Sequence, residues 1–91
     1  MNIAEFESAL RRDEFTEMLT KELPAGCLNA EHSHPFEVRA LVLSGEITLA
    51  VNGQAHAYRE GDVFTMAAGC PHEEAVGPLG VCYLVGRRQA V

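Results

Sequence analysis

The chain has 91 residues and a formal net charge of −6 at pH 7, with 22% charged residues. A chain of this length forms one small domain over residues 1–91, in which folding removes only about 60 to 65% of the unfolded surface from water. A bound metal ion or a second subunit would add stability. The acidic balance argues against nucleic acid as a partner, and no apolar run reaches the roughly 18 residues that predict a membrane span.

The cysteines and the first residues predict where the protein resides. Residues 1–12 are partly acidic, whereas a signal peptide begins with basic and then apolar residues. Cys27, Cys70 and Cys82 are odd in number and lack the CxxC spacing, which favours reduced thiols over a disulfide framework. We therefore expect a cytoplasmic protein.

The N-terminal segment has the pattern of a short helix. Asn2 followed by Glu5 resembles a capping pair, and the apolar positions between Ile3 and Leu10 recur at spacings of three and four. These features predict a helix over about residues 3–12.

From Phe15 onward the pattern changes to one of short strands. Apolar and polar residues alternate weakly as far as Leu23, and turn signals then follow every 8 to 12 residues or so. Such spacing predicts an all-β sandwich or barrel over about residues 15–86. The turn signals are Pro35, Ser44-Gly45, Asn52-Gly53, Glu60-Gly61-Asp62, Gly69-Cys70-Pro71 and Gly77-Pro78.

The strongest local signal is a hairpin over residues 47–58. Two alternating runs flank Asn52-Gly53, a pair suited to a type I′ turn because both central residues of that turn need positive φ. The two-residue turn pairs Val51 with Gln54 and Leu49 with His56.

Two histidine motifs occupy the middle of the chain. Gly26 is followed after five residues by His32-Ser33-His34, and a strand then leads to Gly45; later, seven residues separate Gly61 from Gly69, and His72 follows. This arrangement resembles the two-motif signature of the cupin superfamily, over residues 26–72. The resemblance implies a small jelly-roll barrel, also called a double-stranded β-helix, after the short helix. It also implies a metal site with three histidines and a glutamate.

The spacing is consistent with a metal site. Residues i and i+2 of a strand point the same way, so His32 and His34 can present two imidazoles to one point. His72 can supply a third if its strand lies beside the first. Three imidazoles with open positions suit Zn, Fe, Ni, Mn or Cu, and the ligand type does not choose among these divalent ions.

The acidic ligand departs from the family pattern. Val38 occupies the position of the motif glutamate, and Glu37, one residue earlier, is the nearest carboxylate. A one-residue slip on a regular strand turns Glu37 to the opposite face, unless an irregular turn after Pro35 brings it back. Glu37 is therefore a candidate fourth ligand, and its alternative is an ion pair with Arg39 on the same strand. Ala67 and Val76 replace the proline and asparagine of the second motif.

Two other residues near His72 could complete the site. Glu74 is two residues further along and shares the face of His72 if the strand is regular. It could therefore bind the metal directly or accept a hydrogen bond from one of the histidine ligands. Cys70 is an alternative as a thiolate. His56, in the middle of the hairpin, is expected on the sheet surface, outside the site.

The strand after Pro35 predicts a partner subunit. Val38, Ala40 and Val42 point one way and Leu41 and Leu43 the other, so both faces are apolar and both need a cover. The barrel interior or the N-terminal helix provides one cover, and a second copy of the chain is the expected other. We therefore predict a homodimer.

The cupin resemblance does not name a reaction, because the fold hosts oxygenases, isomerases, decarboxylases, sugar-sensing domains and storage proteins. The leading hypothesis is a barrel that binds a divalent metal and a small polar ligand in its interior, and that functions as a metal-dependent enzyme if it is catalytic. The alternative is a metal-free module that senses or binds a ligand. The catalytic residues, if any, are not indicated.

Overall fold

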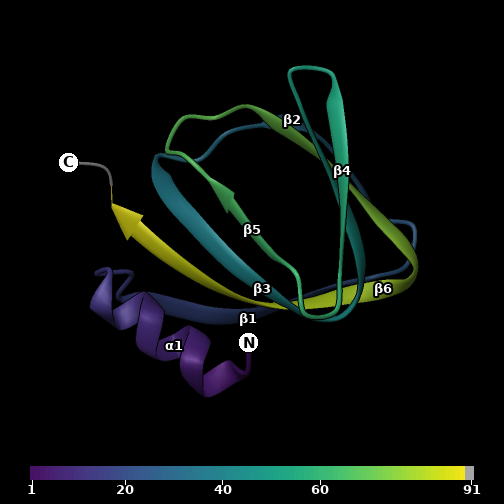
Figure 1. The fold of residues 1–91 in the computed structure, drawn as a ribbon. Helices are drawn as coiled ribbons and strands as arrows, with labels where there is room; N and C mark the ends of the chain where they lie inside the picture. Colours follow the sequence, from purple (N-terminus) through teal and green to yellow (C-terminus); the bar gives the residue numbers. More distant parts are fainter. Residues whose placement is uncertain (90–91) are drawn as a thin grey trace.

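Residues 1–89 are described by a computed structural model of the protein. One helix precedes six strands, with the bounds α1 Ile3–Arg12, β1 Glu17–Leu23, β2 Leu28–His32, β3 Phe36–Val51, β4 Gln54–Arg59, β5 Val63–Met66 and β6 His72–Gln89 (Figure 1). The expected all-β fold with a short N-terminal helix is confirmed. Within residues 1–89 no helix has the length and apolar character needed to cross a membrane.

Two long strands, β3 and β6, connect two antiparallel layers. The first half of β3 pairs with β5 and with the second half of β6, which in turn pairs with β1. The second half of β3 pairs with β4 and with the first half of β6, which pairs with β2. Each layer thus has four strands, and the two layers face each other as the barrel seen in Figure 1.

Helix and hairpin follow the sequence predictions closely. The Asn2 side chain accepts a hydrogen bond from the Glu5 backbone, and the Glu5 side chain accepts one from the Asn2 backbone, which completes a capping box. In the hairpin, Val51 pairs with Gln54 and Leu49 with His56, as expected.

Two of the expected turns are instead bends inside long strands. We predicted turns at Ser44-Gly45 and Gly77-Pro78, but β3 and β6 each continue through these positions. Gly45 has φ 77° and lies so close to the Gly80 backbone that a Cβ atom would overlap the Gly80 carbonyl oxygen. The glycines therefore allow both strands to cross from one layer to the other at the same corner.

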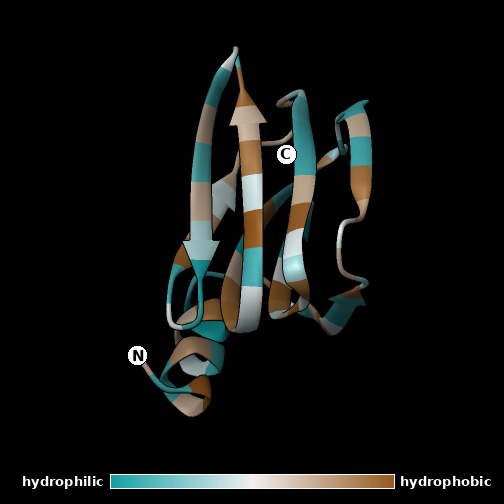
Figure 2. Ribbon diagram, turned by 90° about the vertical axis from the view of Figure 1, so that its right-hand side faces the viewer, coloured by the Kyte–Doolittle hydropathy of each residue, from teal (hydrophilic) through white to brown (hydrophobic). Residues whose placement is uncertain are grey.

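Irregular pairing at the corner changes which side chains point inward. Along β3 the buried interior residues are even-numbered up to Val42 and odd-numbered from Ile47. The register shifts twice in between, as a β-bulge requires. The bulge keeps both halves of the strand facing one interior. Figure 2 shows hydrophilic (teal) and hydrophobic (brown) residues alternating along strands of the barrel.

The main core fills the space between the layers. Aliphatic and aromatic side chains from β3, β5 and β6 provide it, and partly buried residues of β1 and the β1–β2 link pack against it. The buried members are Val38, Ala40, Val42, Ile47, Leu49, Phe64, Met66, Val76, Val81, Tyr83 and Val85.

A smaller core attaches α1 to the outside of the barrel. Phe6, Leu10 and Phe15 pack with Leu41 and Leu84, whose side chains point away from the interior. Both apolar faces of β3 are therefore covered within the chain itself, one by the interior and the other by the helix. The homodimer stays a prediction, but this strand no longer requires it.

Candidate metal centre and cavity

Three chain segments bring the site histidines together. His32 ends β2, His34 lies two residues further on in the link to β3, and His72 begins β6. His32 pairs with His72 in the β2–β6 register, and the Gly69 amide donates a 2.7 Å hydrogen bond to the His34 carbonyl. The turn before β6 thus holds the histidine-bearing link in place.

The three imidazoles form one cluster. One nitrogen from each of His32, His34 and His72 lies within 4.8 Å of the other two, a grouping that could hold a metal ion. The ring centroids are 4.3 Å apart for His32 and His72, 4.9 Å for His32 and His34, and 5.3 Å for His34 and His72. The structure therefore brings together the three histidines chosen from the sequence.

Backbone carbonyls select the tautomers of two rings. Nδ1 of His32 lies 2.8 Å from the Ala30 carbonyl, and Nδ1 of His72 lies 3.0 Å from the Cys70 carbonyl. A carbonyl oxygen only accepts, so each Nδ1 carries the hydrogen and donates it. In the neutral rings each Nε2 therefore has a free lone pair, which is the form that binds a metal.

The His72–Glu74 pair is where a cation fits best. Nε2 of His72 is buried and has no hydrogen-bond partner among the described residues, and a Glu74 oxygen lies 3.5 Å away. The other Glu74 oxygen accepts a 2.7 Å hydrogen bond from Asn29. A lone pair facing a carboxylate in a buried place is costly unless a proton or a metal ion lies between them. The donor set therefore fits a divalent cation.

The surroundings of His34 favour its neutral form. Its ring stacks on Phe36 with a centroid distance of 4.9 Å and an interplanar angle of 12°. Burial lowers the His34 pKa below its usual value, and the nearby His32 and His72 lower it further, whereas Glu74 opposes the shift. A neutral imidazole at this position is ready to act as a ligand.

Glu37 lies elsewhere. Its carboxylate is 2.6 Å from the Arg88 guanidinium on the outer side of the sheet, and Arg39 pairs with Asp13 instead. Both arginines stack on the Phe15 ring at 4.5 Å, so this network attaches the end of the helix to the sheet. No irregularity after Pro35 returns Glu37 to the histidines, and the expected Glu37–Arg39 pair does not form.

Of the other candidate residues, one lies at the histidine cluster and two lie outside it. Glu74 shares the face of His72, as a regular strand predicts, and its side chain is 10% exposed. Cys70 is half-buried and its sulfur lies 3.8 Å from the Pro71 carbonyl, outside the histidine grouping. His56 is exposed on β4, opposite Leu49. Glu74 is thus the carboxylate that the structure brings to the site.

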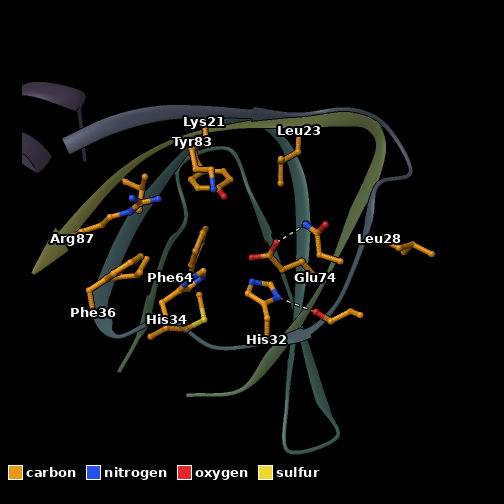
Figure 3. A pocket seen from close by; sticks show the side chains of 15 residues that line it. Lys21, Leu23, Leu28, His32, His34, Phe36, Phe64, Glu74, Tyr83 and Arg87 are labelled. Atoms are coloured by element: carbon orange, nitrogen blue, oxygen red, sulfur yellow. Dashed lines mark hydrogen bonds between the residues drawn. The ribbon is translucent and has the colours of Figure 1, made fainter. Parts of the chain in front are cut away.

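A cavity of about 490 Å³ adjoins the cluster (Figure 3). This volume is in the range of small-molecule sites. Apolar, aromatic and polar side chains line it: Lys21, Leu23, Leu28, Asn29, Ala30, His32, His34, Phe36, Val38, Phe64, Met66, Glu74, Tyr83, Val85 and Arg87.

Four polar residues of the cavity wall were missed in the sequence. Lys21, Tyr83 and Arg87 lie outside the histidine motifs, and Asn29 lies in the spacer between Gly26 and His32. Only Lys21 gave a signal, as the single lysine of the chain within an alternating strand. Burial, with a smaller effect of Glu74, raises the pKa of Tyr83 to about 12. Its hydroxyl is therefore protonated at neutral pH.

Comparison with known proteins finds similar folds among solved structures, whereas no curated protein matches. The cupin domain of Schizosaccharomyces pombe Cnp3 has a TM-score of 0.72 at 19% identity, covering 80% of this chain and 52% of that one. An RmlC-like cupin from Shewanella frigidimarina has a TM-score of 0.67 at 22% identity, covering 80% and 65%. The DMSP lyase DddQ from Ruegeria pomeroyi has a TM-score of 0.72 at 25% identity, covering 81% and 38%.

The chain thus spans between 38% and 65% of the length of these three proteins. The family described as the cupin domain matches residues 19–76, which include the histidine cluster and most of the barrel. The sequence motifs, the two-layered barrel and this match lead to the same conclusion: the chain belongs to the cupin family.

Proposed function

We propose that this protein binds a divalent metal ion through His32, His34 and His72 and a small polar ligand in the adjoining cavity. The observation that carries the proposal is the buried Nε2 of His72, which faces a Glu74 oxygen at 3.5 Å without a hydrogen-bond partner in the described chain. A cation at this point satisfies both groups and the free lone pair of His32.

The donor set defines what kind of ion and chemistry this would be. Three imidazoles, with Glu74 as a fourth ligand or as the partner that orients His72, suit Zn, Fe, Ni, Mn or Cu. Such an ion supplies Lewis-acid or oxygen-activating chemistry when bound. The backbone of the chain fixes the tautomers of His32 and His72, Phe36 stacks on the His34 ring, and the cavity wall would bind the ligand.

Catalysis is the more specific part of the proposal. One of the similar structures is described as a DMSP lyase, which supports an enzymatic role on a small molecule. The alternative from the sequence, a metal-free binding module, uses the same cavity but leaves a proton to satisfy the His72–Glu74 pair. The metal content of the protein separates these two functions.

The test is elemental analysis of untagged protein, supplied with each candidate metal and then freed of excess by gel filtration. We expect close to one ion per chain for the wild type and for His56→Ala, which removes an exposed histidine outside the site. His34→Ala should lose the ion. A wild type without stoichiometric metal, or a His34→Ala variant that retains it, contradicts the proposal.

The cytoplasmic location and the homodimer also belong to this proposal. Three unpaired cysteines support a reducing compartment. For the homodimer the support is the small size of the chain, which leaves marginal stability and sheet edges to be covered. A monomer mass by light scattering at micromolar concentration would contradict the dimer.

A further inference from the structure

The cavity wall opposite the histidines carries an unpaired positive charge. Lys21 is the only lysine of the chain, is half-buried on β1, and lines the cavity. Its ammonium makes no ion pair with any residue in 1–89, although five of the six arginines do so. A half-buried lysine without a counter-ion beside a cavity is a group that an anionic ligand can satisfy.

A second hydrogen-bond donor lies beside it. Lys21 and Tyr83 are directly paired across β1 and β6, so their side chains extend into the cavity next to each other. Figure 3 shows both on the side of the pocket away from His32 and His34. The Tyr83 phenol is protonated at neutral pH, and burial raises its pKa further, to about 12, so it can donate a hydrogen bond to a ligand.

Arg87 adds to the positive character of this wall. Its guanidinium lies 4.7 Å from the Phe36 ring centroid and pairs with Glu17 at 3.0 Å, while its Nε is buried without a hydrogen-bond partner in the described residues. Among the described residues that line the cavity, Glu74 is the only acidic one. With Arg87 paired to Glu17, the Lys21 ammonium is the cation of this wall that has no carboxylate partner among the described residues, in a chain of net charge −6.

We propose that the ligand of this cavity is a small organic carboxylate, whose carboxylate group binds between the Lys21 ammonium and the Tyr83 hydroxyl, with the rest of the molecule toward the histidines. This inference rests on the proposed function, because it names the ligand class of the same site. Two adjacent donors match the two oxygens of a carboxylate. A phosphate group carries up to two negative charges and three acceptor oxygens, more than one ammonium and one phenol at this wall can satisfy.

The single lysine permits a direct test. Reductive methylation with ¹³C-formaldehyde labels two amino groups, Lys21 and the N-terminus of Met1, and keeps both positively charged. Adding malonate should shift the Lys21 signal saturably in the carbon spectrum, while the Met1 signal serves as an internal control. Malonamide, of similar size but uncharged, should leave both signals in place. Equal responses of the two amino groups to malonate would overturn the inference.

Calorimetry on variants gives a second readout. We expect Lys21→Gln to weaken malonate binding about tenfold or more, because a charge-assisted hydrogen bond is lost. Arg11→Gln, which removes an exposed charge on α1, should bind as the wild type does. Affinity within twofold of the wild type in Lys21→Gln overturns the inference.

The two proposals can fail separately. If the metal analysis finds no stoichiometric ion but malonate still shifts the Lys21 signal, the proposed metal function fails and the carboxylate site is supported. Stoichiometric metal together with a Lys21 signal that malonate does not move supports the metal site and overturns the carboxylate inference.

Discussion

At the scale of single residues, the metal proposal depends on how Glu74 is held. Its two oxygens face Asn29 at 2.7 Å and His72 at 3.5 Å, so it is oriented by one contact and available at the other. Partners of this kind commonly change metal affinity about 10- to 100-fold when they are replaced.

Glu74→Gln should therefore lower zinc affinity by about one to two orders of magnitude, because it removes the negative charge that faces His72. Competition with a chromophoric chelator measures this change. Glu73→Gln is the matched control, since Glu73 is the exposed neighbour on the other face of β6. The role given to Glu74 is untenable if both variants bind zinc equally well.

The second residue-scale prediction concerns pH. The Tyr83 pKa is raised from 10.0 to about 12 by burial, so the folded state favours the neutral phenol. Its contribution to stability is complete below pH 10 and is lost as the pH rises toward 12. Absorbance at 295 nm should show a tyrosine ionising near pH 12, and Tyr83→Phe should remove this step. A titration complete by pH 11 or so would show that Tyr83 is not protected.

The sequence predicted the residues of the site in part. Parity along a strand predicted that Glu74 shares the face of His72 and that Glu37 points away unless the strand is irregular. It also predicted that His32 and His34 point together, and they do cluster, although His34 lies in the link after β2 rather than on the strand. The cavity wall could not be predicted in this way, because Lys21 meets Tyr83 only through the pairing of β1 with β6, which are about 60 residues apart in sequence.

At the scale of elements, α1 is attached through a small core of its own. Leu10 is fully buried against the outer face of the barrel, and its methyl groups fill the space above Gly86. Leu10→Ala should lower the free energy of unfolding by about 2 to 5 kcal/mol, because it leaves a cavity there. Urea denaturation measures the loss, and Ile3→Ala, which truncates a side chain that is 49% exposed, should change it by less than about 1 kcal/mol. Similar losses in both variants would mean that α1 is not docked in this way.

Residues close together in sequence were enough to predict the helix and the hairpin. The capping box of α1 and the Asn52-Gly53 hairpin each depend on residues close in sequence, and both are confirmed. The glycines at 45 and 77 gave the same signal as a turn, but their role is a corner between layers. Whether Gly45 forms a turn or a corner depends on its close backbone contact with Gly80, which lies more than 30 residues away in sequence.

At the scale of the whole molecule, a small barrel with a polar cavity should gain much of its stability from what it binds. A metal that binds only the folded state adds about 2.7 kcal/mol at a free concentration 100 times its Kd. For a domain of this size, each kcal/mol raises Tm by about 4 to 8 °C. Thermal unfolding followed by circular dichroism should therefore show a rise of roughly 10 °C or more with the bound metal, and His34→Ala should show almost none. An equal rise in both proteins would locate the metal elsewhere.

The central claim is that three imidazoles from distant segments share one ion. Anomalous diffraction from crystals of the zinc-loaded protein tests it most directly. The account predicts one strong peak at the zinc edge, about 2.0 to 2.1 Å from a ring nitrogen of each of His32, His34 and His72. A peak that contacts fewer than three of these rings, or no peak at the cluster, would contradict it.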